Sequence, residues 1–304
     1  MLNYLLPLAA LTLALPGTVA RKVPRTCAQA AAQVRPAPPL PPIVPDVVSR
    51  GQTTSRVVAL TFDACETLKE TGYDAKVIET LQREHGPATL FLGGRWMWSH
   101  PEETRQLGQA LRADGRPLFE LANHSFLHPH LRKVPDSRVR AELAVTQAIQ
   151  YHLTGRQGRW VRAPFAEYDA RVAEIAGRLG LRLAQFDVVT GDPSPGVTAD
   201  AIVRTVTRGV RPGSVVIMHM NGRGWHTAAA LPRVIAQLRQ SGYRFVTMSE
   251  LPNPDNQLLV ARHPAGGKRL ARRHTLSGTS SSRRKGVVPT SAPTFRTSEF
   301  PPSR

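Results

Sequence analysis

Short apolar runs alternate with amphipathic segments through the middle of the chain. The segments between the runs carry apolar residues at three- and four-residue spacing, which predicts helices at residues 101–114, 136–153, 168–180 and 229–242. The alternation predicts an α/β fold with a parallel sheet, closed into a barrel or open. The seven apolar runs, which we interpret as strands, are residues 56–62, 88–93, 118–123, 159–163, 182–189, 214–219 and 244–248.

The two ends of the chain differ in composition from this middle. Residues 1–20 form an apolar run closed by small residues, which predicts a secretory signal peptide, or an uncleaved anchor because few charges precede the run. Residues 21–52 hold a proline-dense stretch that predicts a semi-rigid linker. Residues 256–304 are rich in Ser, Thr, Arg, Gly and Pro and predict a disordered basic tail. One domain is therefore expected at residues 53–255.

The positive charge of the chain is unevenly distributed. Residues 257–304 hold ten basic residues and one acidic residue, which gives +9, half of the net charge of +18. The tail lacks regular aromatic residues and the chain carries an export signal, so we do not expect nucleic acid as a partner. Contact with an anionic wall polymer or a membrane surface is the expectation. We expect a monomer exported to the periplasm or the extracellular space.

Candidate chemical side chains lie where several predicted strands end. Asp63 ends the first strand, His124 follows the third, Arg162 is in the fourth, Asp192 follows the fifth and His219 closes the sixth. The carboxyl ends of parallel strands in a βα barrel form the rim where active sites are built. This placement predicts one site shared by distant parts of the sequence.

Two histidines, His124 and His128, are four residues apart. On one helical turn this spacing aims both imidazoles at a common point, where a divalent metal could bind. A histidine-rich surface loop is the commoner explanation of an isolated pair of this kind, because metal sites need further ligands. Two cysteines, Cys27 and Cys65, could form one bridge in an oxidising compartment or remain free thiols.

Five motifs in series resemble those of the polysaccharide deacetylases with a NodB homology domain, carbohydrate esterase family 4. The resemblance covers about residues 53–252 and implies a distorted (β/α) barrel with about seven parallel strands. It also implies an enzyme that removes acetyl groups, most simply N-acetyl groups, from a glycan with the help of a divalent metal, for which we expect zinc. The motifs are LTFDACE at 60–66, NHSFLH at 123–128, VRAPF at 161–165, FDVVTGDP at 186–193 and SVVIMHM at 214–220.

The resemblance also implies roles for single residues. Asp63 matches the catalytic base of the family and His219 matches its catalytic acid. Arg162 matches the residue that orients the base, and Asp192 matches the acidic residue that keeps the acid histidine protonated. Each of these side chains alone has an ordinary structural explanation, such as a strand end or a turn, so the series of motifs carries the interpretation.

The metal site departs from the family pattern at one position. His124 and His128 match the two metal-binding histidines, but Ala64 stands where the family usually has a second Asp ligand, and a methyl group cannot bind a cation. Asp63 itself could also lean onto the metal. The substitutes that the sequence offers, in our order of preference, are Glu66, Cys65 and His130.

Substrate contacts are expected at the same rim. Pro164 and Phe165 follow Arg162, and Trp225 lies in a glycine-containing loop after His219, where an indole could stack on a sugar. The sequence does not name the glycan. The alternative function is a catalytically impaired carbohydrate-binding barrel that lost its metal with the change to Ala64.

Overall fold

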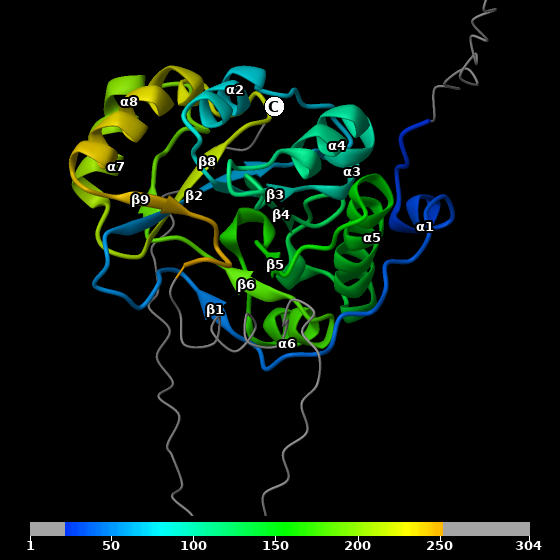
Figure 1. The fold of residues 1–304 in the computed structure, drawn as a ribbon. Helices are drawn as coiled ribbons and strands as arrows, with labels where there is room; N and C mark the ends of the chain where they lie inside the picture. The colour runs from blue at the N-terminus through cyan, green and yellow to red at the C-terminus, as the bar shows by residue number, and fades with distance from the viewer. Residues whose placement is uncertain (1–21, 252–304) are drawn as a thin grey trace, which may run out of the picture. The chain divides into compact units, whose positions relative to one another are not determined.

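The computed structural model of the protein describes residues 22–251, which contain one nine-stranded sheet. Every ladder between its strands is parallel, and the strand order is β1-β6-β5-β4-β3-β2-β8-β7, with β9 pairing with the first residues of β2. Figure 1 shows this sheet surrounded by helices. The strands are β1 (Val47–Val48), β2 (Val57–Ala64), β3 (Ala88–Leu92), β4 (Phe119–Asn123), β5 (Trp160–Val161), β6 (Arg182–Ala184), β7 (Val188–Val189), β8 (Ser214–His219) and β9 (Arg244–Val246).

The sheet curls into an incomplete barrel. Strands β6 and β7 lie near opposite ends of the strand order, yet only residues 185–187 separate them in the chain. So short a connection can join the two ends only if the sheet bends round on itself. Among the described residues no ladder joins β6 to β7, so the barrel stays open there. The predicted α/β barrel of parallel strands is confirmed, and the single strand predicted at 182–189 is two strands.

Burial explains the strand sequences. All eight residues of β2 and all five of β3 are buried, as expected for parallel strands covered by helices on one side and by the barrel interior on the other. Helices α2, α7 and α8 lie on one flank of the sheet, and α3, α4 and α5 lie on another (Figure 1). The helices are α1 (Cys27–Ala31), α2 (Ala75–Arg83), α3 (Gly94–Ser99), α4 (Pro101–Gln109), α5 (Asp136–Thr154), α6 (Ala170–Arg178), α7 (Ala199–Gly209) and α8 (Thr227–Gln240), with 3-10 turns η1 (Leu131–Lys133) and η2 (Pro164–Ala166).

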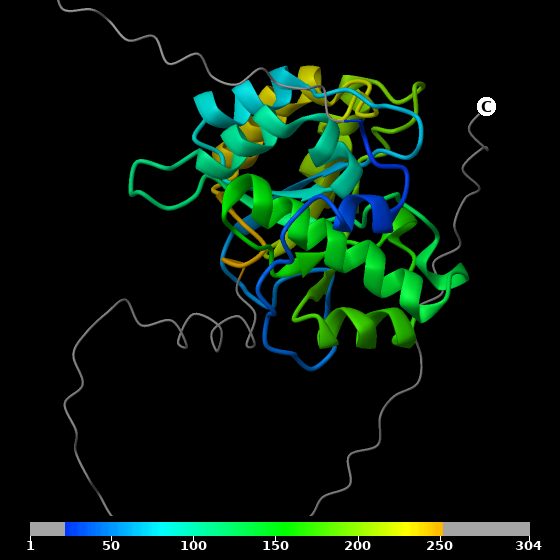
Figure 2. The ribbon, with the colours of Figure 1, turned by 90° about the vertical axis from the view of Figure 1, so that its right-hand side faces the viewer.

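The prediction of a linker at residues 21–52 is wrong for the residues that the structure describes. Helix α1 packs along α5 with Cys27 and Ala30 buried, as the two ribbon views agree (Figures 1 and 2). Further along, the amide of Ile43 donates to the carbonyl of Gly177, and β1 adds a strand beside β6. The proline-rich segment therefore wraps around the domain, because its apolar side chains pack against α5 and α6.

The helix predicted at residues 101–114 ends earlier than expected. Helix α4 stops at Gln109, and the chain turns back through Asp114 and Gly115, whose φ of 78° suits glycine. In the described range 22–251 no helix is long and apolar enough to cross a bilayer. The predicted signal peptide at residues 1–20 and the predicted tail at 256–304 lie outside that range.

Candidate active site

The candidate residues gather at the carboxyl ends of the parallel strands. Asp63 is the penultimate residue of β2, and His219 ends β8 directly beside it, since the register of the two strands pairs Asp63 with His219. His124 follows β4 and Arg162 follows β5. The structure therefore brings together side chains that are up to 156 residues apart in the sequence.

A buried ion pair holds the expected base. The Nη1 of Arg162 donates to Oδ1 of Asp63 over 2.7 Å, and the guanidinium lies 4.0 Å from the centre of the Phe91 ring. Burial favours the neutral carboxyl, but the positive charge and hydrogen bond of Arg162 hold the pKa of Asp63 below its usual value. The carboxylate is thus ionised and fixed in direction, as a proton acceptor must be.

A second carboxylate holds the expected acid. Asp192 accepts hydrogen bonds from the backbone amide of His219 over 2.7 Å and from its Nδ1 over 3.0 Å. Because Nδ1 is engaged, Nε2 is the ring atom left to face the site. Burial alone would lower the pKa of His219, but the charge and hydrogen bond of Asp192 raise it above the usual value. Thr190 and Thr227 donate to the same carboxylate and fix its orientation.

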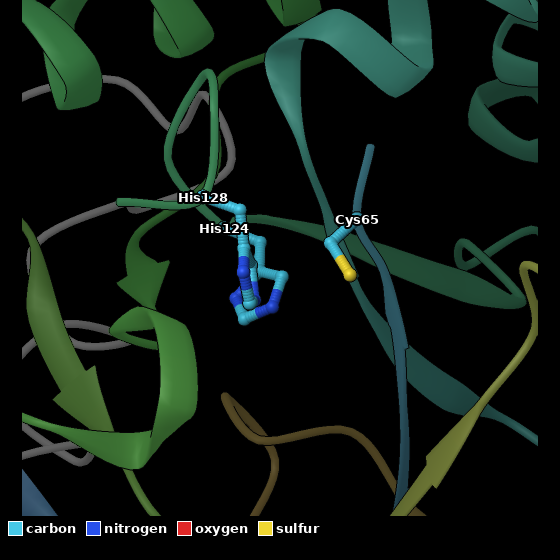
Figure 3. Close-up of side chains that lie close together, drawn as sticks. All are labelled: Cys65, His124 and His128. Carbon is cyan, nitrogen blue, oxygen red and sulfur yellow. The ribbon is translucent and has the colours of Figure 1, made fainter. Parts of the chain in front are cut away.

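The histidine pair lies on a loop, so the predicted helical turn is wrong. Ser125 and His128 have φ angles of 62° and 56°, outside the helical region. The loop nevertheless brings the rings of His124 and His128 to 5.0 Å between centroids. Figure 3 shows the two imidazoles side by side, with the side chain of Cys65 nearby at the end of β2.

Hydrogen bonding fixes which nitrogen of His124 is available. Its Nδ1 lies 2.9 Å from the carbonyl oxygen of Arg162, and because a carbonyl can only accept, Nδ1 carries the proton. Burial lowers the pKa of His124 and lowers that of His128 well below its usual value, so both rings are neutral. The unprotonated Nε2 of His124 then faces Oδ2 of Asp63 at 3.6 Å. Two buried acceptors in this arrangement are suited to a cation beside them.

The structure places Cys65 beside the two histidines, and not Glu66, which was our first preference. Atoms of Cys65, His124 and His128 that can bind a metal all lie within 4.8 Å of one another. Glu66 points elsewhere: its Oε1 lies 3.0 Å from Nε of Arg95 and accepts a hydrogen bond from Ser99. The reason is strand geometry, because side chains alternate across β2 and Cys65 returns to the side of Asp63.

Two further points complete the comparison of ligands. Ala64 has no exposed surface and lies in the large apolar cluster of the core. His130 is stacked on Phe165 with ring centroids 4.0 Å apart, and its Nδ1 lies 2.9 Å from Oε2 of Glu167. His130 is therefore engaged by Phe165 and Glu167 and is not among the donor atoms that lie within 4.8 Å of one another.

The surroundings of Cys65 suit a metal ligand. Burial and the Asp63 carboxylate raise the pKa of the thiol to about 11, so it stays protonated unless a cation displaces the proton, as bound cations do. Asn221 donates to the carbonyl oxygen of Cys65 over 2.6 Å and approaches its Sγ. One thiol and two imidazoles are a donor set that fits zinc, and three protein donors leave one position open.

The expected substrate residues differ in exposure. Phe165 is 52% exposed and Trp225 is 58% exposed, although both are large apolar side chains, whereas Pro164 is buried. Phe165 has a φ of 59° and its ring meets the ring of His128 edge to face. The backbone amide of Trp225 donates to the carbonyl of Asp192. The ring of Phe165 and the backbone of Trp225 thus each contact a residue of the site.

The two cysteines are free, and they belong to different regions. Cys27 lies 3.5 Å from Oε1 of Glu142 on α5, and Cys65 lies at the site, so the bridge that the sequence left open does not form. Sequence reasoning missed Asn221, Thr227 and Glu142. Asn221 follows His219 closely and could have been noticed, whereas nothing in the pattern of α5 marks Glu142.

A carboxylate held by Arg162 lies beside a histidine whose pKa is raised by Asp192, next to side chains that could hold a metal, and this arrangement suits acid–base hydrolysis. Comparison with known proteins agrees: residues 50–184 match the polysaccharide deacetylase family model. A peptidoglycan-N-acetylglucosamine deacetylase of Bacillus cereus is 30% identical over 196 residues, which cover 64% of this chain and 67% of that protein. The chain belongs to the polysaccharide deacetylases, hydrolases that act on carbon–nitrogen bonds other than peptide bonds.

Solved structures give the same family. One peptidoglycan N-acetylglucosamine deacetylase, bound to a naphthalenyl N-oxidanyl-benzamide, aligns with a TM-score of 0.61 at 28% identity and covers 68% of this chain and 92% of that chain. A pseudoenzyme of carbohydrate esterase family 4 from Bacillus anthracis aligns with a TM-score of 0.60 at 25% identity and covers 69% of each chain. Similarity thus extends to a relative described as inactive.

Proposed function

We propose that the protein is an exported, metal-dependent deacetylase that removes acetyl groups, most simply N-acetyl groups, from a cell-wall glycan. One observation carries the proposal. An ionised Asp63 and a His219 that favours its protonated form stand on neighbouring strands, beside the three metal donors of the site. A binding module would need neither the base nor the acid.

Asp63 serves as the general base in this proposal. Its Oδ1 is held by Arg162, so Oδ2, which faces His124, is the oxygen free to take a proton from water. Arg162 is buried and itself rests on the Phe91 ring, so the carboxylate cannot turn away. General bases of this kind contribute about 10²–10⁴-fold to a rate.

His219 serves as the general acid. Nδ1 is bonded to Asp192, so the proton for the departing amine comes from Nε2. The raised pKa keeps that proton in place at a pH where a free histidine has lost it. Gly224 allows this arrangement, because a Cβ there would lie 2.5 Å from the carbonyl oxygen of His219 and 3.0 Å from Oδ2 of Asp192.

Cys65, His124 and His128 would hold the metal. A bound divalent cation supplies polarisation of the acetyl carbonyl and lowers the pKa of a water molecule. We propose zinc because a thiolate ligand favours it over harder divalent cations. The neutral state of both imidazoles and the fixed tautomer of His124 support the assignment.

The relatives named as peptidoglycan deacetylases support peptidoglycan as the substrate class. The exposed rings of Phe165 and Trp225 offer apolar faces on which sugars could stack, and Pro164 shapes the turn that carries Phe165. Export rests on the apolar residues 1–20, and a wall location suits the basic residues 257–304 as a contact for anionic polymer. No nucleic-acid partner is proposed.

The test is acetate release by purified protein from N-acetylglucosamine oligomers and from peptidoglycan fragments. We expect release that stops on addition of a chelator and returns with zinc. Metal-dependent release of acetate from either substrate supports the proposal. Acetate release at an unchanged rate in the presence of the chelator contradicts metal dependence. A panel that also contains acetylated xylan distinguishes N-acetyl from O-acetyl substrates.

A second candidate is a carbohydrate-binding barrel without catalysis. It is favoured by Ala64, which stands at the family's usual metal ligand, and by the likeness to a pseudoenzyme. Protein that binds glycan but retains no metal after dialysis against zinc, and releases no acetate, would support this candidate over the enzyme.

A further inference from the structure

A buried carboxylate lies behind the histidine loop, outside the proposed site. Glu142, on α5, has no exposed surface. Its Oε2 accepts hydrogen bonds from the backbone amides of Phe126 and Leu127, each over 2.7 Å. These two amides lie between His124 and His128 in the sequence. The carboxylate therefore binds the middle of the loop that carries both imidazoles.

The other oxygen of Glu142 is also engaged. Oε1 accepts from Nε of Arg138 over 2.9 Å and lies 3.5 Å from Sγ of Cys27. Burial, and then the charge of Glu142, raise the pKa of the Cys27 thiol to about 12, so this thiol is a hydrogen-bond donor to the carboxylate. The first turn of α1 thereby supports the same group that holds the histidine loop.

The loop needs such support because two of its residues have energetically unfavourable backbone conformations. Ser125 and His128 are non-glycine residues with positive φ, a conformation that persists only where the surroundings determine it. Ser125 contributes one bond, since its Oγ accepts from the amide of His128 over 3.2 Å. Charge-assisted bonds to backbone amides are about twice as strong as neutral ones, so Glu142 provides the larger restraint.

We propose that Glu142 is a positioning residue for the metal, holding the histidine loop in the ligand geometry before a cation binds, with Cys27 reinforcing it. The proposal rests on the proposed function, because it assumes that His124 and His128 are ligands. The ordinary alternative is that Glu142 stabilises the fold alone. The two differ in what is lost on substitution: metal affinity, or only resistance to unfolding.

A matched control lies at the opposite end of the sheet. Glu120 is the second residue of β4, accepts a hydrogen bond from Thr89 over 2.9 Å and holds the backbone amide of Ser249. It is a carboxylate that restrains local backbone, as Glu142 does, but its partners are Thr89 and Ser249 instead of residues of the histidine loop. A substitution there reports the general cost of losing such a group.

The experiment measures zinc affinity by competition with a chromogenic chelator in full-length Glu142→Gln, Glu142→Ala, Cys27→Ala and Glu120→Gln. The Co²⁺-loaded proteins give the absorption of the ligand field, and urea unfolding gives stability. We expect zinc binding to weaken about 10–100-fold in Glu142→Ala, the range for partners of metal ligands. A smaller loss is expected in Glu142→Gln, which keeps an acceptor without the charge, and the smallest in Cys27→Ala.

Glu120→Gln should bind zinc as the unchanged protein does, even if urea unfolds it earlier. Equal zinc affinity in the Glu142 variants and the unchanged protein would overturn the proposal, as would an equal loss in Glu120→Gln. If Glu142→Ala does not fold, Glu142→Gln decides by the same criterion. Failure of the unchanged protein to bind zinc would overturn the proposed function as well, so the two failures are distinguishable.

Discussion

The two halves of the site are built in different ways. Asp63 and His219 stand within paired strands, and each is held by one buried partner, Arg162 or Asp192. The proposed metal donors lie beyond the strand ends, on a backbone that itself needs restraint. Strand pairing therefore sets the distance between the proposed acid and the proposed base, whereas the position of the proposed metal depends on how a loop is held. The acid–base half should tolerate changes in its surroundings better than the metal half.

The largest effect should come from the acid–base half itself. Asp63→Asn keeps the shape of the side chain but removes the proton acceptor, so acetate release should fall about 10²–10⁴-fold while the fold persists. Asp187→Asn is the control, because the partners of Asp187 are the backbone amide of Val215, the hydroxyl of Ser214 and the guanidinium of Arg211, none of which belongs to the proposed site. Retention of more than about a tenth of the activity in Asp63→Asn would contradict its role as the base.

The metal half is tested by separating Cys65 from Glu66. Cys65→Ala should weaken zinc binding by about tenfold or more and abolish the sulfur-to-cobalt absorption band of the Co²⁺ form, because a ligand is lost. Glu66→Gln should leave zinc affinity nearly unchanged and lower the urea midpoint, since Glu66 is the buried partner of Arg95. If Glu66→Gln weakened zinc binding and Cys65→Ala did not, our assignment of the ligand would be reversed.

The pH profile sharpens the description of the acid. Asp192 raises the pKa of His219 against the effect of burial, so protonated His219 persists to higher pH than a free histidine. Activity that requires this proton falls as pH rises through the raised pKa. In Asp192→Asn the alkaline limb of kcat/KM should move to lower pH. The charge pair also stabilises the fold below the pKa of unfolded histidine, and this contribution is lost as pH rises through the folded pKa. An unmoved limb would exclude His219 as the acid.

The smallest effect is expected at the rim. Trp225→Ala removes an exposed ring that is proposed to stack on sugar, and should raise KM for an oligosaccharide about two- to tenfold, equivalent to about 0.5–1.5 kcal/mol. Turnover should change little, because Trp225 lies outside the acid and base. Leu68→Ala, at another exposed apolar side chain, is a control. An identical change in both variants would mean that Trp225 makes no specific contact.

The acid–base half could be predicted from the sequence because strands and motifs coincide. The run at 56–62 became β2 at Val57–Ala64, and the run at 214–219 became β8 with the same bounds. The metal half could not be predicted in the same way. The positive φ angles of Ser125 and His128 replaced a helical turn, and Glu66, our preferred ligand, found a partner in Arg95, which lies 29 residues away. Such choices follow from tertiary contacts.

The N-terminal segment shows a related limit. Its proline content predicted a semi-rigid linker, but composition does not reveal whether a neighbouring surface can receive the segment. Gly180 illustrates the point, because a Cβ there would lie 2.5 Å from Cβ of Leu40. Only a residue without a side chain allows the segment around Leu40 to approach Gly180 so closely. The hydrophobic and polar pattern of the sequence does not show that two distant segments fit together in this way.

The burial of Ala64 bears on the history of the site. Its methyl group is enclosed in the apolar core, so an Asp at this position would now place a charge among hydrocarbon side chains unless its neighbours rearranged. If the lineage once had the carboxylate that its family usually carries, the core has since closed over the place where it stood. A return to that carboxylate would then need several substitutions at once, and if Cys65 serves as the donor that we propose, such a return would bring little gain.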